Sequence, residues 1–301
     1  VSAGWMVVGA PWSLITYVFH KTGWGAWTEH SQLSSPAGAD ANDRFGSSVA
    51  IDGDSIVVGA PEDDACSTSI AHDTGSVAQD DDSCTEAGSV SVFVLTNDAW
   101  VLQAYLKSPN AAAGQEFGES VVIAGDTVLV GAPGAPQVTV FARMSDDTGA
   151  FLTWNVRQVV TAPRVGAGEF GSRLALSNNT LVVGAESDEG CIPGVFNGVA
   201  SFPVSTGCST AGGAYVFERN SGVWEAQAYL KPPVVTDYDR FARALTIEGD
   251  TIAVADADKQ TSVRAYVFER NSSGIWEHQA NLSPIPSAGG STSSLAMRDG
   301  A

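Results

Sequence analysis

The side chains that most often perform acid–base or nucleophilic chemistry are sparse in this chain. Its only histidines are His20, His30, His72 and His278, and each is better explained as a surface or strand residue than as a catalytic base. A serine follows Gly53-Asp54, but similar phrases recur at 125–127 and 249–251 and mark a repeated turn. Because no nucleophile and base are predicted to converge, we expect a protein that is not an enzyme. A glycoside hydrolase with a carboxylate pair remains the enzymatic alternative in so acidic a chain.

Four cysteines offer a different chemistry, the formation of disulfides. They fall as two pairs in two long loops of similar length, Cys66 with Cys84 and Cys191 with Cys208. Four cysteines allow three connectivities, and the equivalent placement predicts two local bridges. Reduced thiols or a metal site are the alternatives, although the short Cys-x-x-Cys spacing of zinc sites is absent. Disulfides predict an oxidising, extracellular location, and so a secreted or cell-surface protein.

Three N-glycosylation sequons, at Asn178, Asn271 and Asn281, are also consistent with an extracellular location. An Asn-x-Ser/Thr triplet is an acceptor for N-glycans in secreted proteins. Asn178 and Asn271 lie in predicted turns, where a glycan has room, whereas Pro284 follows the third sequon. Sequons also arise by chance, so an unmodified surface stays the alternative.

The net charge of the chain limits the classes of partner that it is expected to bind. Thirty-four acidic against fifteen basic residues give a net charge of −19, which repels phosphate backbones and anionic lipid surfaces. Nucleic-acid binding is therefore not expected, and no apolar run approaches the roughly 20 residues of a membrane-spanning helix. The chain opens at Val1 without a leader, and we interpret it as a mature chain whose targeting segment is absent.

A repeat organises the elements that hold these residues. Its copies begin at Asp43, Glu116, Glu169 and Asp239. Each reads as a strand, a tight turn and a second strand, because aliphatic residues flank pairs such as Gly53-Asp54 and Asn178-Asn179 that suit hairpin turns. A third strand follows, for example 90–94, and then a fourth that carries a tryptophan about six residues before an aliphatic residue.

Four short antiparallel strands repeated radially are typical of a β-propeller. The sequence therefore predicts an all-β fold, a single β-propeller domain over residues 1–301 with about five blades. The recurring phenylalanines and tryptophans are expected to pack between blades. We place the blades at 1–42 plus 288–301, 43–114, 115–168, 169–238 and 239–287.

The first of these blades is a composite of the two ends of the chain. The segment Trp5-Met6-Val7-Val8 is a second strand with no first strand before it, whereas Ser293-Ser294-Leu295-Ala296-Met297 matches the first strand at 47–51. Pairing the two would satisfy an open sheet edge. The terminal strand closes either its own ring or the first blade of a neighbouring molecule, and the second option predicts a homo-oligomer or polymer.

The Phe-Gly pairs at 45–46, 117–118 and 170–171 and the Gly-Ala-Pro triplets at 9–11, 59–61 and 131–133 resemble the FG-GAP repeats of integrin α-subunit head propellers. The sequence is still more similar to repeats of bacterial and algal extracellular proteins. The resemblance covers essentially the whole chain. It implies a propeller that acts in extracellular adhesion, ligand binding or surface assembly, usually with seven blades, so a count of five departs from the family.

Integrin-type repeats often bind calcium through an Asp-x-Asp-x-Asp-Gly loop, and no loop of this chain has that full spacing. Acidic loops supply the nearest candidate ligands, Asp63, Asp64, Asp256 and Asp258, since carboxylate oxygens suit Ca²⁺. The alternative is that these carboxylates only keep the loops soluble, with no cofactor bound.

These observations favour a secreted, non-enzymatic structural or adhesive propeller that assembles into an extracellular filament or coat through its terminal strand. The alternative is a cell-adhesion module that binds an extracellular protein or glycan, with or without calcium. A propeller glycoside hydrolase is the third interpretation.

Overall fold

A computed structural model describes residues 1–23, 25–36, 42–72, 83–145, 152–256, 264–282 and 294–297. These residues form an all-β fold of strands β1–β20 with two short 3₁₀ turns, η1 (Pro11–Ser13) and η2 (Val199–Ser201). The chain divides into two compact units, Val1–Val159 and Val160–Ala301. Among the described residues, no helix has the length and apolar character needed to cross a membrane.

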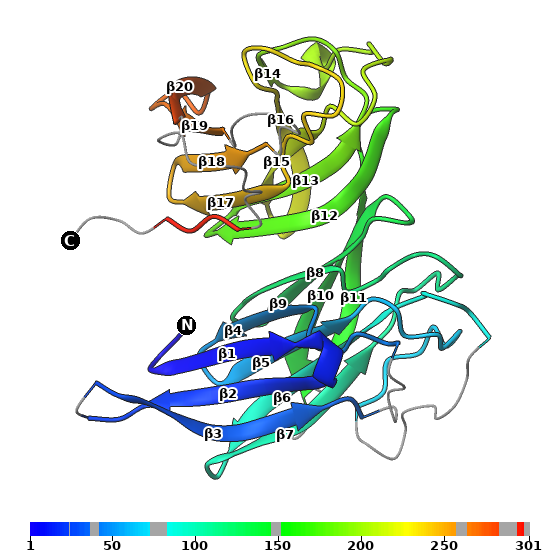
Figure 1. Ribbon diagram of the computed structural model, residues 1–301, viewed down its shortest axis with the longest axis vertical. Coiled ribbons are helices and arrows are strands. Elements are labelled where there is room, and N and C mark those ends of the chain that lie inside the picture. The colour runs from blue at the N-terminus through cyan, green and yellow to red at the C-terminus, as the bar shows by residue number, and fades with distance from the viewer. Residues whose placement is uncertain are drawn as a thin grey trace. The chain divides into compact units, whose positions relative to one another are not determined.

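Unit 1 holds three antiparallel sheets (Figure 1). Sheet I has the order β1-β2-β3, with β1 (Trp5–Ala10), β2 (Ile15–Lys21) and β3 (Trp27–Ser34). Sheet II has the order β4-β5-β6-β7, with β4 (Ser48–Asp52), β5 (Ser55–Ala60), β6 (Ser89–Thr96) and β7 (Ala99–Leu106). Sheet III has the order β8-β9-β10-β11, with β8 (Ser120–Ala124), β9 (Thr127–Ala132), β10 (Gln137–Ser145) and β11 (Leu152–Thr161).

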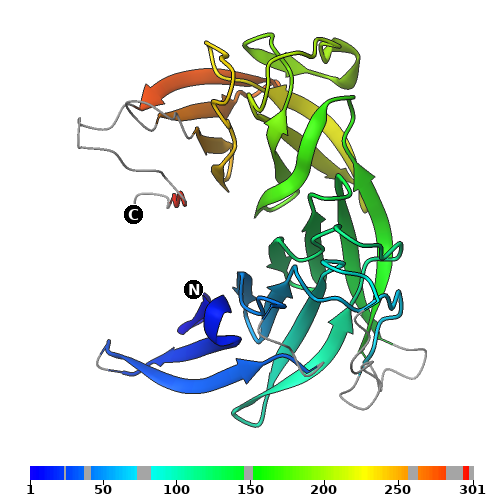
Figure 2. The same ribbon diagram turned by 45° about the vertical axis from the view of Figure 1, so that its right-hand side comes forward.

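Unit 2 holds two sheets, whose strands are seen from a second side in Figure 2. Sheet IV has the order β12-β13-β15-β16-β14, with β12 (Ala167–Ser177), β13 (Thr180–Asp188), β14 (Val195–Asn197), β15 (Gly213–Asn220) and β16 (Val223–Leu230). Sheet V has the order β17-β18-β19-β20, with β17 (Ala244–Glu248), β18 (Thr251–Ala255), β19 (Ala265–Arg270) and β20 (Trp276–Leu282).

The turns between first and second strands follow the sequence prediction. Their leading residues, Gly53, Gly125, Asn178 and Gly249, have φ values of 56°, 53°, 51° and 56°. Glycine and asparagine are the residues that adopt this left-handed region at least cost. The hairpins therefore form where the sequence places these residues.

Close backbone contact between successive sheets explains the Phe-Gly and Gly-Ala-Pro phrases. A Cβ added at Gly9 would lie 1.9 Å from the carbonyl oxygen of Gly46, and one at Gly59 would lie 2.1 Å from that of Gly118. The backbone of the loop that leads into one sheet, at Gly46 or Gly118, thus lies directly against a glycine of the preceding sheet, Gly9 or Gly59. A side chain at either position would force the two sheets apart, so glycine is required.

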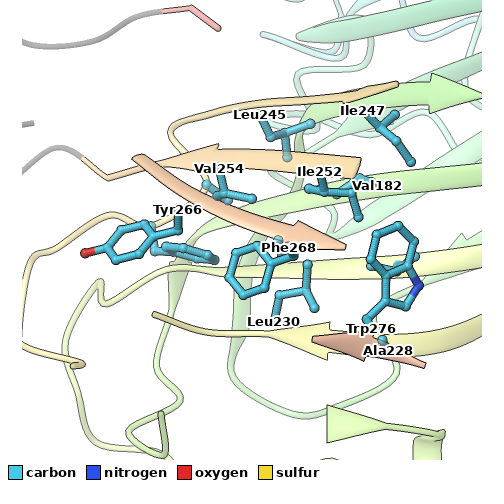
Figure 3. Packing of buried hydrophobic residues seen from close by; sticks show 14 residues of the cluster. Val182, Ala228, Leu230, Leu245, Ile247, Ile252, Val254, Tyr266, Phe268 and Trp276 are labelled. Atoms are coloured by element: carbon cyan, nitrogen blue, oxygen red, sulfur yellow. The ribbon is translucent and has the colours of Figure 1, made fainter. Parts of the chain in front are cut away.

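The hydrophobic cores lie between neighbouring sheets. In unit 2, side chains of sheets IV and V interdigitate around Phe268 and Trp276 (Figure 3). In unit 1, the equivalent layer between sheets II and III contains Phe117, Phe141 and Trp154. Of the aromatic residues predicted to pack between blades, Phe117, Trp154, Phe241 and Trp276 lie in these layers, where each large apolar side chain contributes roughly 2–3 kcal/mol when fully buried. Trp27 does not fit the prediction, because its side chain is 37% exposed.

Two sheets differ from the four-strand expectation. Sheet IV has a fifth strand, because β14 from the Cys191–Cys208 loop pairs with β16. Sheet I has three strands, and the described residues Ser294, Leu295, Ala296 and Met297 have no strand assignment. Ser293 lies outside the described residues. The composite blade therefore stays a prediction, as does the grouping of all blades into one domain.

Candidate functional site

Both predicted disulfides are present. Cys66–Cys84 and Cys191–Cys208 have Cα–Cα distances of 4.9 and 5.2 Å and sequence separations of 18 and 17 residues. Each bridge closes part of a loop that leaves the second strand of its sheet and returns to the third strand. In a loop-entropy model a ring of this size stabilises the fold by roughly 3 kcal/mol.

The two disulfide loops reach the outer edge of their own sheets. Ala71 exchanges backbone hydrogen bonds of 3.0 and 2.8 Å with Tyr105 of β7, and β14 pairs with β16 so that Phe196 lies opposite Tyr229. The loops therefore cover part of an edge that would otherwise expose unpaired backbone groups.

A buried carboxylate anchors the first loop at its start. Asp63, 3% exposed, accepts hydrogen bonds from Lys107 Nζ at 2.8 Å, Tyr105 Oη at 2.5 Å and Ser89 Oγ at 2.9 Å. The backbone N–H of Ala65 donates to the same carboxylate at 3.1 Å. One buried cation thus balances one buried anion, and both carboxylate oxygens are hydrogen-bonded.

Asp188 occupies the equivalent position before the second loop, with different partners. Arg164 Nη1 lies 2.7 Å from its carboxylate, and Tyr215 Oη and Tyr229 Oη each donate at 2.6 Å. Lys231, the counterpart of Lys107, lies 3.7 Å away and donates instead to the Gly212 carbonyl oxygen. Arg164 also donates from Nη2 and Nε to two carbonyl oxygens inside the loop, those of Ser205 and Pro203. This cluster therefore joins the loop, the sheet and the preceding segment.

Burial shifts the titration of these groups in the directions expected for structural clusters. Desolvation and the neighbouring carboxylate raise the pKa of Tyr105, Tyr215 and Tyr229 above the usual range, so these hydroxyls remain donors. Desolvation lowers the pKa of Lys231 to about 8, with the Asp188 carboxylate opposing and Arg164 adding to that shift. Each shifted group is engaged by neighbouring protein groups, as in an internal ion-pair network.

The candidate calcium ligands have protein partners. Lys107 holds Asp63, Asp64 accepts the Glu86 N–H at 2.7 Å, and Asp256 accepts from Tyr266 at 2.9 Å. Asp258 lies outside the described residues. Among the residues that the structure describes, no group of three or more His, Cys, Asp or Glu side chains is placed to hold a metal ion. Calcium binding stays a prediction.

The three sequon asparagines are exposed. Asn178 lies at the turn between β12 and β13, with Asn271 in the turn before β20 and Asn281 near the end of β20. Asn271 uses its side-chain oxygen to accept from the Ser273 and Ile275 N–H groups at 3.0 and 3.1 Å. Glycosylation at these positions stays a prediction.

Trp12 and Arg44 form an exposed aromatic platform, and the sequence alone did not predict that these two residues pair. Trp12 in η1 is 82% exposed, and the guanidinium of Arg44 lies 5.1 Å from the centre of its ring. Arg44 is in turn 3.0 Å from Glu62. A planar indole held by a cation presents a surface that can stack on a ligand ring.

A family model for the FG-GAP repeat matches residues 27–77 and 100–149. The chain carries FG-GAP repeats. The copies at 169–185 and 239–256 extend the same pattern into unit 2, with Ala242 in the place of the repeat glycine. The resemblance predicted from the Phe-Gly and Gly-Ala-Pro phrases is confirmed.

Two solved structures resemble this chain in fold. A protein from Bacteroides uniformis, proposed to be a 6-phosphogluconolactonase, is 14% identical over 94% of this chain and 69% of its own, with a TM-score of 0.56. A protein from Lactobacillus plantarum is 12% identical over 93% of this chain and 82% of its own, with a TM-score of 0.43. No curated protein matches the sequence. With the repeats, the first likeness supports a propeller-like all-β fold.

Sequence reasoning missed the two buried anchors. The signal was the phrase Gln-Ala-Tyr-Leu-Lys, which occurs at 103–107 and 227–231, only in the two repeats that carry cysteines. Its tyrosine and lysine both reach the loop aspartate in each case. A buried lysine is rarely found without a carboxylate partner, so this repeated lysine at a strand end could have pointed to Asp63 and Asp188.

Proposed function

We propose that this protein is a secreted, non-enzymatic structural propeller of five blades that assembles into an extracellular filament or coat through its terminal strand. The observation that carries the proposal is sheet I. Sheets II, III and V each have a first strand paired with the second, β4 with β5, β8 with β9 and β17 with β18. In the described residues β1, which matches β5, pairs with β2 and ends the sheet.

The terminal segment has the chemistry of the missing strand. Ser294-Leu295-Ala296-Met297 repeats the pattern of Ser48-Val49-Ala50-Ile51, and Val49 and Ile51 pack against the core between sheets I and II. Leu295 and Met297 would fill the same places in a neighbouring sheet I. Main-chain hydrogen bonds to β1 would supply affinity, and these alternating side chains would supply specificity.

The buried anchors support a structural rather than catalytic role. The groups with the largest pKa shifts are locked into ion pairs and hydrogen bonds that fix the disulfide loops. Two disulfides support the secreted location. A rigid, cross-linked blade suits a protein that must persist outside the cell.

A labelled peptide of residues 288–301 tests the proposal against a chain truncated to residues 1–287. We expect saturable binding by fluorescence anisotropy, and loss of binding when the peptide carries Leu295→Asp and Met297→Asp. A peptide with Ser291→Ala is the matched control and should bind like the original. Equal binding of the original and aspartate peptides, or none by either, would contradict strand complementation.

The exposed Trp12 supports a second candidate, the binding of an extracellular glycan or protein ligand. A single aromatic platform can stack on a sugar ring, and Arg44 and Glu62 beside it can hydrogen-bond sugar hydroxyls. The test is a glycan array probed with the wild-type chain and with Trp12→Ala. Signals that persist in Trp12→Ala would remove this candidate.

A further inference from the structure

The outer strands of sheets II, IV and V share a β-bulge with a glutamine at the same position, whereas sheet I has His30 there. The register shifts between Val92 and Phe93, between Val216 and Phe217, and between Val267 and Phe268. The residues left unpaired opposite these steps are Gln103, Gln227 and Gln279. A β-bulge turns such a side chain out of the regular alternation.

Two of these glutamines make the same bond across a sheet interface. Trp154 Nε1 of sheet III donates to Gln103 Oε1 of sheet II at 2.8 Å, and Trp276 Nε1 of sheet V donates to Gln227 Oε1 of sheet IV at 2.9 Å. Both indoles are buried, at 0% and 1% exposure. The same bond is therefore made at two interfaces between successive sheets, II with III and IV with V.

The third glutamine, Gln279, and the exposed tryptophan, Trp27, do not make this bond in the described residues, and the buried Trp100 Nε1 also has no hydrogen-bond partner. Gln279 on sheet V is exposed. Trp27, which pairs with Lys21 as Trp276 pairs with Arg270, is 37% exposed on sheet I. Sheet I thus offers the indole, and sheet V offers the amide.

The apolar residues around each half follow the same pattern. On sheet I, Met6, Val8 and Phe19 are partly or fully exposed, Val8 at 43%, whereas their equivalents on sheet III are fully buried. Those equivalents are Val128, Val130 and Phe141, and the register matches because Met6 pairs with Phe19 as Val128 pairs with Phe141. The face of sheet I that carries Trp27 therefore has the side chains of an inter-sheet face, and no other described sheet of unit 1 covers it.

On sheet V, the face that carries Gln279 is not covered by another described sheet of unit 2. Leu282 is 52% exposed, while its equivalents Leu106 and Leu230 are fully buried. Val267 is partly exposed, where Val92 and Val216 are fully buried. This face matches the covering faces of sheets II and IV in side-chain size and in the position of its glutamine.

We propose that sheet V of one copy packs against sheet I of a second copy, with the Trp27 indole donating to Gln279. The two faces are unlike and complementary, so the contact is heterologous and repeats from copy to copy. The inference rests on the proposed assembly but concerns the sheet faces rather than the strand edge. The predicted terminal strand follows sheet V in the chain, so one neighbour would supply both the cover and the missing strand.

Cross-linking of two single-cysteine variants tests the contact. Trp27→Cys and Gln279→Cys chains are mixed and treated with a bis-maleimide, whose spacer bridges the distance that the two long side chains would span. We expect a covalent dimer from the mixture and none from either variant alone. Ser272→Cys, in the exposed turn before β20, replaces Gln279→Cys as the control and should give no dimer with Trp27→Cys.

Two results would overturn this inference. One is a mixture that yields no dimer above the Ser272→Cys control. The other is a chain with both cysteines that cross-links only within itself and keeps the monomer mass, which would show that one chain closes its own ring.

Leu282→Asp separates this inference from the proposed function. The residue is half exposed, so folding should be retained, with an unchanged near-ultraviolet circular dichroism spectrum as the check. We expect the variant to lose assembly in light scattering. If assembly persists in Leu282→Asp but disappears on removal of residues 288–301, strand complementation stands and the sheet-face contact is wrong. If Leu282→Asp abolishes assembly and the truncation does not, the reverse holds.

Discussion

The buried clusters around Asp63 in sheet II and Asp188 in sheet IV both hold the start of a disulfide loop, but with different cationic side chains. Asp63 faces one lysine, which binds it directly, and a serine that adds a hydrogen bond. Asp188 faces an arginine, which takes the direct contact and moves the equivalent lysine to 3.7 Å. In place of Ser89, sheet IV has Gly213, and in place of Ser91 it has Tyr215, whose hydroxyl reaches the carboxylate.

This difference shows which part of the anchor is fixed. The buried carboxylate and the tyrosine of the outer strand are common to both, whereas the cation varies in type, number and distance. In the Asp63 cluster the lysine neutralises the aspartate. In the Asp188 cluster Arg164 already does so, and Lys231 is a second buried cation whose charge is disfavoured, as its lowered pKa indicates.

Removal of the Asp188 carboxylate should have the largest effect. Asp188→Ala leaves Arg164 and Lys231 buried without an anion, and we expect a loss of about 3–5 kcal/mol in the free energy of unfolding. Urea titration followed by tryptophan fluorescence measures it. Asp126→Ala, whose carboxylate is 68% exposed in its pair with Arg143, is the control and should cost less than about 1 kcal/mol. Equal losses would refute the anchor role.

The two lysines should respond differently to the same substitution. Lys107→Met leaves Asp63 without its cation and should lower the free energy of unfolding by about 3 kcal/mol. Lys231→Met removes a disfavoured charge and should change it by no more than about 1 kcal/mol, since the lost bond to the Gly212 carbonyl offsets part of the gain. The same urea titration compares them. Similar losses for both variants would contradict the division of roles between lysine and arginine.

The pH dependence of stability should also distinguish Lys231 from Lys107. The folded pKa of Lys231 is about 8, below its ordinary value of 10.5, so between these values the unfolded chain binds more protons than the folded chain. The contribution of Lys231 to stability therefore rises with pH in this window, by roughly 1–3 kcal/mol. The measurement is the difference in unfolding free energy between wild type and Lys231→Met at pH 7.5 and pH 10. Taking this difference cancels the ionisation of unfolded tyrosines, and a constant difference would count against the assignment.

A smaller effect than at Asp188 or Lys107 is expected at Ser89. Its hydroxyl donates to the Asp63 carboxylate at 2.9 Å, and Ser89→Ala should lower the free energy of unfolding by about 1.5 kcal/mol, the lower end of the range for one hydrogen bond to a charged acceptor. Ser91→Ala, at a buried position two residues along β6, is the matched control. A cost at Ser91 equal to that at Ser89 would show that the hydroxyl contact with Asp63 is not what matters.

Local chemistry made much of the fold predictable. The turn residues at 53, 125, 178 and 249 and the alternating aliphatic residues around them fixed the hairpins, and the equivalent loops placed the cysteine pairs. Asp63 and Lys107 are 44 residues apart, so their contact depends on the path of a loop that strand patterns do not describe. The fifth strand at Val195–Asn197 arises in such a loop and was missed for the same reason. The bulge that turns Gln103 toward Trp154 was also not predicted, because it depends on the register between β6 and β7.

We propose that copies of this chain complete one another at their ends. The most direct measurement is the mass in solution, by light scattering, of the full chain and of residues 1–287 over a range of concentrations. We expect concentration-dependent assemblies of the full chain that disappear on truncation, while the truncated chain stays folded. A full chain that remains a monomer at every concentration, and that truncation only destabilises, would contradict it.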